Sequence, residues 1–401
     1  MKPEAARVEA TPDRETRLEA ARVEAMSGRE MGPEAAFGEA GLEREETMAA
    51  ENKAYIVIRA DGNADIGVGH LMRCLTIAEQ AGGPGGVAFW CADEGSAALV
   101  RDRGYTALVL GTDYRHMVQE LPQLETLARD LRPGAVILVD SYFVTEEYLH
   151  ALGTYARVYL LEDMPGRVWP VDGVINYNAF ADRGFYQQIY RQTGQTVSLY
   201  IGAEYVPLRP QFAGHACQVR ERARELLVTT GGGDRENIAG KILETIGDGM
   251  CRIHVVSGPY NPHRTWLDSY AADHPWVTVY RQVTHMAELM AQCDLAVTAG
   301  GTTVYELCAL GVPFVCFSYA ENQEALAEYA GTRKAGLYAG KYHQDPAGTL
   351  DSIGSLVRLA AVDSELRWQM SCRARRLVDG RGARRVAEAL LGAAKCGTEH
   401  I

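Results

Sequence analysis

The sequence predicts an α/β protein with two parallel β-sheets, preceded by a low-complexity extension. From residue 53 onward, short β-branched runs alternate with amphipathic helical stretches, which is the pattern of parallel α/β structure. The alternation occurs twice, and a less periodic Tyr- and Gln-rich stretch that ends near Pro210 separates the two series. In open sheets of this class, ligands bind at the carboxyl ends of the strands. We therefore expect two Rossmann-like domains, 53–208 and 209–401, that face each other across a ligand cleft.

The strands of each domain are expected where apolar, β-branched runs are bounded by glycines or polar turns. Those of the first domain are predicted at 55–60, 86–92, 107–111, 135–140, 158–162 and 173–178. Helices are expected between them, for instance at 70–80 and 121–131. The strands of the second domain are predicted at 225–230, 252–258, 277–282, 294–299 and 313–319.

Residues 1–52 form a degenerate repeat of Ala, Glu and Arg, as in "PEAARVEA" and "GPEAAFGEA", with few large apolar side chains. This composition favours helix but leaves little to bury, so we expect frayed helix or disorder. One interpretation is an arm that docks a partner. The favoured interpretation is an extension that is dispensable or not translated, in which case Met48 is a candidate start.

Charge and cysteine content restrict the function classes. Half of the net charge of −12 lies in residues 1–52, where 13 acidic side chains outnumber 7 basic ones. A net negative chain has no excess of cations with which to displace counterions, which argues against nucleic acid or an anionic membrane as a partner. No apolar run of about 18 residues is present, so no membrane span is predicted. The nine cysteines are scattered without a C-x-x-C pair, which predicts reduced thiols in a cytoplasmic protein and no zinc site. No oligomeric state is predicted.

The first motif that indicates chemistry is "IRADGNADIGVGHLMRC" at 58–74. A strand ends at Arg59 and Asp61, and a glycine-containing loop leads through Gly69 into a helix that begins at His70 and carries Arg73. The positive end of the helix disfavours a charged histidine, so His70 is expected to be neutral and able to accept a proton. A purely structural role at the helix start is the alternative, and we favour catalysis.

The same glycines are not a dinucleotide-binding motif. Gly67 and Gly69 supply the first two glycines of G-x-G-x-x-G, but Met72 occupies the third position. A nicotinamide-dependent dehydrogenase is therefore disfavoured, although Asp93 after the second strand could imitate the acid that binds ribose.

Polar residues also follow three later strands of the first domain. The strand of "LVDSYFVT" ends with Asp140 and Tyr142, where Asp140 could orient His70 and Tyr142 could contact substrate. Helix capping by Asp140 is an equally good interpretation. Asp163 in "LLEDMP" and Asn176 in "INYN" could bind hydroxyl or amide groups of a sugar, although such residues more often form turns.

The second domain carries two glycine-rich junctions between a strand and a helix. "TTGGGDREN" places Gly231, Gly232 and Asp234 where a diphosphate could lie against the helix start, but it lacks the Gly-Lys-Ser/Thr ending of a P-loop. "TAGGTTVYE" is the more informative junction. Its residues expected to bind phosphate are Gly300, Gly301, Thr302 and Thr303. Glu306, one turn later, could accept both hydroxyls of a ribose, and Asn322 and Gln323 after the next strand suit a sugar.

Taken in order, these motifs resemble those of a family. The set "RAD…GxGHxxR", "VDSY", "ED", "NxN", "GxxYxxLRxxF", "GGGD" and "AGGTTVYELCALGVP…NQ" is similar to that of the UDP-2,4-diacetamido-2,4,6-trideoxy-β-L-altropyranose hydrolases of pseudaminic acid biosynthesis. The resemblance covers roughly residues 53 to 340. These hydrolases are related to the N-acetylglucosaminyltransferase of peptidoglycan lipid intermediates and share its two-domain GT-B fold.

The resemblance implies that His70 is catalytic and that the second domain holds UDP. Gly232 and Asp234 would lie near the phosphates, Glu306 on the ribose, and Asn322 with Gln323 near the diphosphate or the sugar. One position departs from the family, because some relatives have His where this chain has Ser141. A contact to the sugar is therefore expected to differ.

The function expected on these grounds is hydrolysis of a UDP-activated 2,4-diacetamido-2,4,6-trideoxyhexose to UDP and the free sugar, with inversion and without metal or cofactor. His70 would activate a water, and Asp61, Asp140 and Tyr142 complete the set of catalytic candidates. The partner is thus a small molecule, a UDP-linked sugar. Two alternatives stay open: a glycosyltransferase that uses a UDP-amino-sugar donor, and a non-catalytic protein that binds nucleotide sugars.

Overall fold

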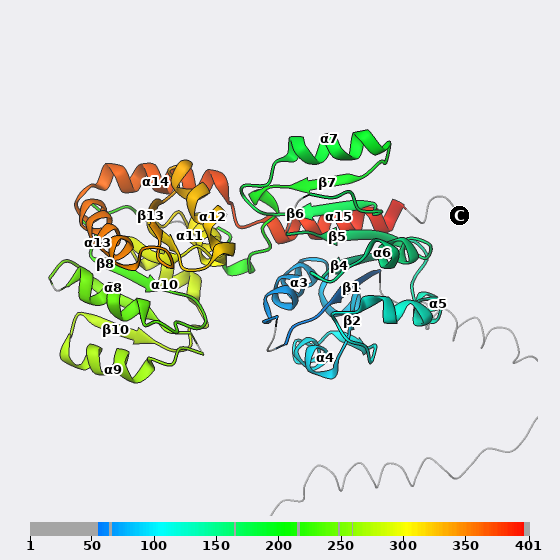
Figure 1. The fold of residues 1–401 in the computed structure, drawn as a ribbon, viewed down its shortest axis with the longest axis horizontal. Helices are drawn as coiled ribbons and strands as arrows, with labels where there is room; N and C mark the ends of the chain where they lie inside the picture. The colour runs from blue at the N-terminus through cyan, green and yellow to red at the C-terminus, as the bar shows by residue number, and fades with distance from the viewer. Residues whose placement is uncertain are drawn as a thin grey trace, which may run out of the picture. The chain divides into compact units, whose positions relative to one another are not determined.

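The computed structural model describes residues 55–63, 66–163, 166–214, 217–247, 249–258 and 260–396. The predicted extension at 1–52 lies outside the described residues. Contacts divide the chain into residues 1–51 and residues 52–401, and both β-sheets belong to the second of these units. Figure 1 shows the order of the elements along the chain.

The first sheet is wholly parallel and has seven strands in the order β3-β2-β1-β4-β5-β6-β7. Its strands are β1 (Ile56–Ala60), β2 (Val87–Cys91), β3 (Thr106–Val109), β4 (Val136–Asp140), β5 (Arg157–Leu161), β6 (Gly173–Asn176) and β7 (Ser198–Ile201). Every residue of the central strands β1 and β4 is buried, as expected where helices cover both faces of a parallel sheet.

The connections between these strands are mostly helical. They are α3 (Gly69–Gln80), α4 (Glu94–Arg101), α5 (Leu124–Arg129), α6 (Glu146–Leu152) and α7 (Arg183–Thr193), with short 3₁₀ turns at Gly83–Gly85, Met117–Gln123 and Ala203–Tyr205. Local caps set two of the helix starts. Asp93 accepts a hydrogen bond from the backbone N–H of Ser96, and Thr145 accepts one from that of Tyr148.

The second sheet repeats this topology with six parallel strands in the order β10-β9-β8-β11-β12-β13. Its strands are β8 (Glu225–Thr229), β9 (Arg252–Val256), β10 (Val277–Tyr280), β11 (Leu295–Ala299), β12 (Phe314–Ser318) and β13 (Leu337–Lys341). Its helices are α8 (Ile238–Ile246), α9 (Arg264–Asp273), α10 (Met286–Gln292), α11 (Thr302–Leu310), α12 (Glu321–Thr332), α13 (Pro346–Val362) and α14 (Ser364–Leu377).

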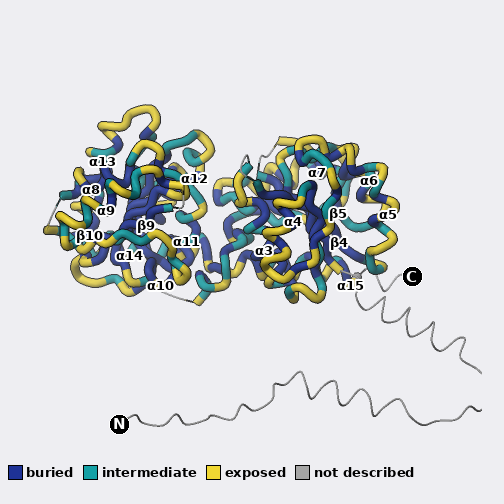
Figure 2. Tube along the Cα trace, turned by 90° about the horizontal axis from the view of Figure 1, so that it is seen from below, coloured by how far each residue is buried: buried dark blue, intermediate teal, exposed yellow. Residues whose placement is uncertain are grey.

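Each sheet has apolar cores on both faces, and the strands form the buried centre that Figure 2 shows. The last helix, α15 (Gly382–Cys396), packs on the first sheet although it follows the second in sequence (Figure 1). Val386 and Leu390 lie in the same core cluster as Leu71 and Leu138. The range predicted for the second domain, 209–401, thus includes a helix whose side chains share a core with the first sheet.

The strands predicted from sequence all form, but the stretch before Pro210 is more regular than expected. It contains α7 and the edge strand β7, and the second sheet gains the edge strand β13. Both edge strands are only partly buried, and β13 contains Gly340 at a positive φ of 123°. Their sequences lack the continuous apolar run by which buried strands are recognised.

Each sheet has one topological switch point, the place where open α/β sheets bind ligands. In each sheet, the chain reverses its direction of winding between two adjacent strands, β1 and β4 in the first and β8 and β11 in the second. The loops that follow such a pair diverge to opposite faces and leave a crevice at the carboxyl edge. In the first sheet, the loop after β1 leads to His70 in the first turn of α3, and the loop after β4 contains Tyr142. In the second sheet, these loops contain Gly231 and Gly301.

Candidate active site

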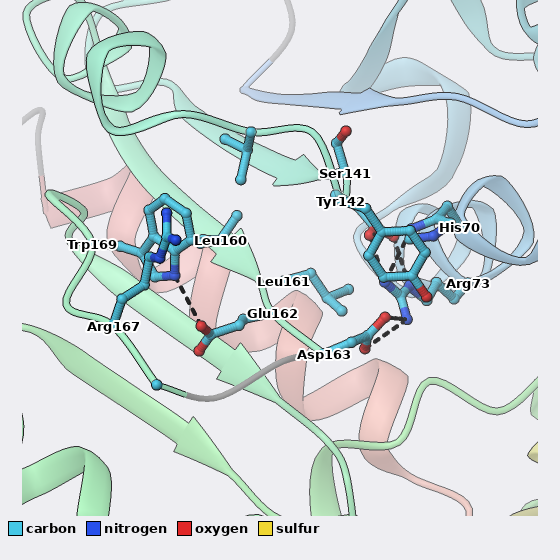
Figure 3. Close-up of a pocket in the computed structure, with 13 residues that line it drawn as sticks. His70, Arg73, Ser141, Tyr142, Leu160, Leu161, Glu162, Asp163, Arg167 and Trp169 are labelled. Carbon is cyan, nitrogen blue, oxygen red and sulfur yellow. Dashed lines mark hydrogen bonds and ion pairs between the residues drawn. The ribbon is translucent and has the colours of Figure 1, made fainter. Parts of the chain in front are cut away.

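A cavity of about 360 Å³ opens at the carboxyl edge of the first sheet, where β4 and β5 end. Figure 3 shows His70, Arg73 and Tyr142 at one end of it and Arg167 and Trp169 at the other. The remaining lining residues are Asp140, Ser141, Val144, Leu160, Leu161, Glu162, Asp163 and Gly166. The cavity thus has an ionic end and an aromatic end, with an apolar wall between them.

At the ionic end, His70 and Asp140 form a pair. Asp140 is the last residue of β4 and is 1% exposed, and its Oδ1 lies 2.6 Å from Nδ1 of His70 in the first turn of α3. An ionised carboxylate can only accept a hydrogen bond, so Nδ1 of His70 carries the proton. In the neutral ring, Nε2 is then the nitrogen that can accept a proton. The expectation that Asp140 could orient His70 agrees with this geometry.

Arg73 completes the cluster one turn along α3. Its Nε donates to Oδ2 of Asp140 at 2.7 Å, and its Nη1 donates to Oδ2 of Asp163 at 2.9 Å. Burial disfavours the charged forms of Asp140 and Arg73, but their mutual attraction outweighs this effect. The pKa of Asp140 therefore lies well below its usual range and that of Arg73 well above. Asp140 is thus a stable anion beside the histidine.

Tyr142 covers this end of the cavity from the loop after β4. Its ring meets that of His70 edge to face, with the ring centres 4.4 Å apart, and it is 54% exposed. Burial, and then the charge of Asp163, raise the pKa of its hydroxyl. An exposed ring held against His70 can contact a substrate that reaches the histidine. Ser141 also lines the cavity.

Arg73 is linked to the second sheet through aromatic residues. Its Nη1 donates to the hydroxyl of Tyr177 at 2.5 Å, and the ring of Tyr177 packs edge to face against that of Tyr305, which belongs to α11. The hydroxyl of Tyr305 accepts a hydrogen bond from the backbone N–H of Ala179 at 3.1 Å. The helix that begins at the "GGTT" loop therefore touches the residues that hold Arg73 in place.

Two predicted site residues, Arg59 and Asp61, are paired with each other. Arg59 is fully buried, and its guanidinium bonds to Asp61 at 2.5 Å and to both carboxylate oxygens of Glu120. Asp61 also accepts a hydrogen bond from the backbone N–H of Ala92. The structure therefore disagrees with substrate binding by Arg59, which is fully buried with its charge paired. Asp61 lines a small pocket together with His70 and Tyr142, so a catalytic role for Asp61 stays a prediction. Glu120, which sequence analysis missed, lies 61 residues from Arg59 and has no local signal.

Asn176 is also part of the framework. It is fully buried at the end of β6, its amide donates to the hydroxyl of Tyr186, and its Oδ1 accepts from the backbone N–H of Asn178. A side chain in this position does not reach a substrate. Asp163, in contrast, lines the cavity as predicted, and 17% of its side chain is exposed.

The aromatic end of the cavity was not predicted as a site. Trp169 donates its indole N–H to Oε1 of Glu162 at 2.9 Å, and the hydroxyl of Tyr186 donates to Oε2 at 2.6 Å. Burial raises the pKa of Glu162, and these two hydrogen bonds act in the opposite direction. The guanidinium of Arg167 lies over the Trp169 ring, 4.9 Å from its centre. The sequence signal was weak because these residues follow a strand in an irregular loop.

In the second sheet, the glycine loop after β8 lies against the loop after β9. Gly231 has a positive φ of 93° and is exposed, as is Gly232. A Cβ on Gly258 would lie 2.4 Å from the carbonyl oxygen of Gly232, so this contact requires glycine. The hydroxyl of Tyr319, which follows β12, lies 3.7 Å from the Cβ position of Gly231. The loop is thus held from two sides with its glycines open to solvent.

Asp234 does not contribute an open anion site. Its carboxylate is buried and accepts the backbone N–H groups of Ile238 at 2.7 Å and Ala239 at 2.8 Å, at the start of α8. A carboxylate already occupies the place where a phosphate would bind to this helix, so Asp234 is a capping residue. An Asp just before a helix is itself a capping signal that the sequence contains.

The junction after β11 is the open one. In the first turn of α11 no side chain caps the helix and no acidic residue is present. The backbone N–H groups of Gly301 and Val304 already donate to the carbonyl groups of Ala299 and Gly301, so those of Thr302 and Thr303 are the ones available to an anion. A Cβ on Gly301 would meet nothing within 4 Å, whereas one on Gly300 would lie 2.7 Å from the carbonyl oxygen of Gln323. Gly300 therefore permits close packing with α12, and Gly301 leaves room. Thr302 is exposed and Thr303 is half-buried beside it.

Glu306, Asn322 and Gln323 surround this junction. Glu306 is mostly buried, with 14% of its side chain exposed, and pairs with Arg209 at 3.3 Å. Burial raises its pKa, although Arg209 opposes the shift. Asn322 is exposed in the first turn of α12, and Oε1 of Gln323 accepts the backbone N–H of Tyr319. The structure thus brings the predicted residues of the second sheet to one edge.

Over the described ranges, no group of three or more His, Cys, Asp or Glu side chains could hold a metal ion. No described helix has both the length and the apolar composition needed to cross a membrane.

The class that this architecture defines is the GT-B fold, and a comparison with solved structures confirms the predicted fold class. MurG of Acinetobacter baumannii is 14% identical and superposes with a TM-score of 0.60 over 84% of this chain and 99% of its own. The calicheamicin glycosyltransferase CalG4 is also 14% identical and gives a TM-score of 0.54 over 85% of this chain and 98% of its own.

Sequence comparisons point to particular relatives within this class. The profile of the glycosyltransferase family 28 C-terminal domain matches residues 227–351. The spore coat polysaccharide biosynthesis protein SpsG of Bacillus subtilis is 28% identical over 349 residues, which are 84% of this chain and 97% of its own. The UDP-2,4-diacetamido-2,4,6-trideoxy-beta-L-altropyranose hydrolase of Campylobacter jejuni is 23% identical over 279 residues, 68% of this chain and 95% of its own.

Proposed function

We propose that this chain is an enzyme that acts on a UDP-sugar and that it hydrolyses a UDP-activated 2,4-diacetamido-2,4,6-trideoxyhexose to UDP and the free sugar. The observation that carries the proposal is the His70–Asp140 pair at the wall of a sugar-sized cavity. Similarity to the Campylobacter jejuni hydrolase supplies the substrate class. The resemblance of this chain's motifs to those of the hydrolases of pseudaminic acid biosynthesis supports a place in that pathway.

His70 acts as the general base in this scheme. A water that donates to Nε2 attacks the anomeric carbon from the face opposite the leaving group. The bond from that water to C1 forms as the bond from C1 to the phosphate oxygen breaks, and the proton passes to Nε2. UDP leaves with the electron pair, so the configuration at C1 inverts. Asp140 holds Nδ1–H and stabilises the charged imidazole. Because UDP is a good leaving group, neither a metal ion nor a strong general acid is required.

The second sheet binds the UDP portion. The open N-terminus of α11 receives the diphosphate, and its N–H groups stabilise the charge that develops as the C1–O bond breaks. Gly301 supplies the space, Thr302 and Thr303 supply hydroxyl donors, and Glu306 accepts the ribose hydroxyls. Gly231 and Gly232 approach the same nucleotide from the loop after β8, and Asn322 approaches it from α12.

An isotope experiment tests the reaction directly. The enzyme is incubated with the UDP-sugar in ¹⁸O-water with EDTA present, and both products are analysed by mass spectrometry. We expect one labelled oxygen in the free sugar, none in UDP, and undiminished turnover with the chelator. Label in UDP would mean attack at phosphorus, and complete loss of activity with EDTA would contradict a metal-independent reaction.

A glycosyltransferase is the second candidate, because the profile that matches residues 227–351 is that of a glycosyltransferase family 28 domain. In that case an acceptor hydroxyl replaces the water, with the same donor site. The rate of UDP release without any acceptor separates the two functions. Hydrolysis predicts the full rate without acceptor, whereas a transferase predicts a rate that rises by orders of magnitude when the acceptor is added.

A further inference from the structure

The aromatic end of the cavity, formed by Glu162, Arg167 and Trp169, is not used by the reaction described above. His70, Arg73 and Tyr142 lie at the opposite end (Figure 3). Because the cavity is continuous, a sugar ring placed against His70 directs one of its substituents toward Trp169. The chemistry of these residues indicates what that substituent is.

The two charged side chains at this end are held by Trp169 in different ways. Glu162 is 6% exposed and accepts the indole N–H at 2.9 Å, and Arg167 lies over the face of the same ring. Within the described ranges, no residue accepts a hydrogen bond from the guanidinium of Arg167, which is exposed. Arginine has five N–H donors in a planar fork, so this group can bind a ligand oxygen.

Glu162 supplies the complementary acceptor. Its carboxyl group receives one hydrogen bond on each oxygen, from Trp169 and from Tyr186. A carboxylate has about four lone-pair sites, so acceptor capacity remains on Glu162, which lines the cavity. A donor and an acceptor therefore lie within one small region.

The wall between the two ends is apolar. Val144, Leu160 and Leu161 line it, and the two leucines are almost fully buried, Leu160 in the core on one face of the sheet and Leu161 in the core on the other. Burial of a methyl group against such a wall is favourable, by about 0.8 kcal/mol for each CH₂-sized group. A hydroxyl in the same place would lose its hydration without a partner.

We infer that this end of the cavity is a subsite for an N-acyl group of the sugar, in which Arg167 donates to the amide oxygen, Glu162 accepts the amide N–H, and the methyl contacts the apolar wall. An N-acetyl group has one N–H donor, one carbonyl acceptor and an apolar methyl. These three parts match the acceptor Glu162, the donor Arg167 and the apolar wall. A hydroxyl offers a single oxygen and no methyl. The subsite therefore selects N-acylated amino sugars over their hydroxyl counterparts. This inference rests on the proposed function and adds the residues that recognise the substrate.

Binding measurements with three ligands test the inference. UDP is titrated calorimetrically into the full chain, as are the C-glycosidic analogues of a UDP-2,4-diacetamido-2,4,6-trideoxyhexose and of the matching UDP-6-deoxyhexose, which has hydroxyls at C2 and C4. In these analogues a methylene group replaces the anomeric oxygen, so the enzyme cannot hydrolyse them. We expect the diacetamido ligand to bind at least about ten-fold more tightly than the hydroxyl ligand, the size of one hydrogen bond to a charged group. In Arg167→Gln this preference should fall by about ten-fold, with the affinity for UDP unchanged.

Matched variants make the result specific. Arg191→Gln removes an exposed arginine of α7 that does not line the cavity, and it should keep the full preference. Trp169→Phe removes the indole N–H that holds Glu162, and it should lower the preference in the same direction as Arg167→Gln. A melting curve for each variant verifies that it is folded. Because Arg167 is exposed, a loss of the binding preference in Arg167→Gln does not come from altered core packing.

The outcomes separate the inference from the proposed function. Failure of the parent protein to bind UDP overturns the proposed function and this inference with it. Binding of UDP combined with equal affinity for the two sugars overturns the inference alone. A preference that survives in Arg167→Gln does the same.

Discussion

Replacement of Asp140 by Asn is the most informative perturbation of the candidate active site. Asp140 accepts hydrogen bonds from Nδ1 of His70, from Nε and Nη2 of Arg73 and from the thiol of Cys74. Asn has nearly the same shape but presents two N–H donors in place of one carboxylate oxygen. Those donors point at His70 or Arg73, which are donors themselves. The substitution therefore leaves at least one buried donor unpaired.

The cost to stability follows from burial. The Asp140 side chain is fully buried and 11% of the Arg73 side chain is exposed, so solvent screens their attraction poorly. Removal of one partner from a buried ion pair costs about 3–5 kcal/mol. Arg73 keeps its second partner, Asp163, so we expect a value near the lower limit.

The pH dependence of that cost has a definite sign. Burial works against ionisation of Asp140, but Arg73 and His70 depress its pKa in the folded protein. The unfolded carboxyl group titrates near pH 3.9, so this stabilisation is present above about pH 4 and is lost as the pH falls through the depressed folded pKa. The difference in free energy of unfolding between parent and Asp140→Asn should therefore shrink below about pH 4.

Loss of activity should exceed what the loss of stability explains. Without the carboxylate, Nδ1 of His70 no longer has a fixed acceptor, and Nε2 is not held as the base. General-base catalysis contributes about 10²–10⁴-fold, so kcat should fall within that range at temperatures where the variant is folded. Release of UDP measures kcat, and urea unfolding followed by tryptophan fluorescence measures stability. A folded Asp140→Asn that keeps kcat within about three-fold of the parent would refute the role of the pair, because it lies below the range for a general base.

Asp294→Asn provides a matched control for this experiment. Asp294 is also fully buried, pairs with Arg220 and accepts backbone N–H groups of Arg224 and Glu225. It precedes β11, at the opposite edge of the sheet from the glycine loops. This variant should lose stability without loss of kcat, which separates the two effects.

Three further predictions test other parts of the structure. Gly258→Ala places a Cβ 2.4 Å from the carbonyl oxygen of Gly232, so it should displace the glycine loop and cost about 1–3 kcal/mol in stability. It should also weaken UDP binding, as measured by calorimetry, and unaltered binding would contradict a nucleotide site at this loop. Arg59→Met leaves Glu120 buried without its cation and should lower the free energy of unfolding by about 3–5 kcal/mol, as measured by urea unfolding. An unchanged unfolding midpoint would show that the pair does not stabilise the protein. Glu306→Gln should weaken UDP binding by about ten-fold with little change in melting temperature, since 42% of the side chain of its partner Arg209 is exposed to solvent. Equal affinity would exclude Glu306 from the ribose site.

Much of the site was predictable because its residues follow strands. His70 and Asp140 lie 70 positions apart, yet β1 and β4 are neighbours, so their carboxyl ends meet. Asn176 and Asp61 also follow strands, but their side chains are used by Tyr186 and Arg59. Strand ends predict the edge where a ligand binds, but they do not predict which polar groups there are already paired.

Three other residues show why the rest required coordinates. Glu120 neutralises Arg59 from a 3₁₀ turn with no sequence pattern of its own. Trp169 and Arg167 reach the cavity from an irregular loop, where neither helical nor strand periodicity applies. Such contacts depend on how distant segments pack, and no local property of the chain encodes them.

By itself, the sequence determined the class of fold, the two edges at which ligands would bind and the glycine junction that leaves a helix end open. These features depend on local periodicity and on backbone freedom, which neighbouring residues specify. Only the tertiary structure showed that Asp140 contacts His70, that Asp234 closes one helix end and that one cavity is lined by both His70 and Trp169. The physical reason is that a charged or polar group acts on a ligand only when no other group already satisfies it, and its partners come from distant parts of the chain.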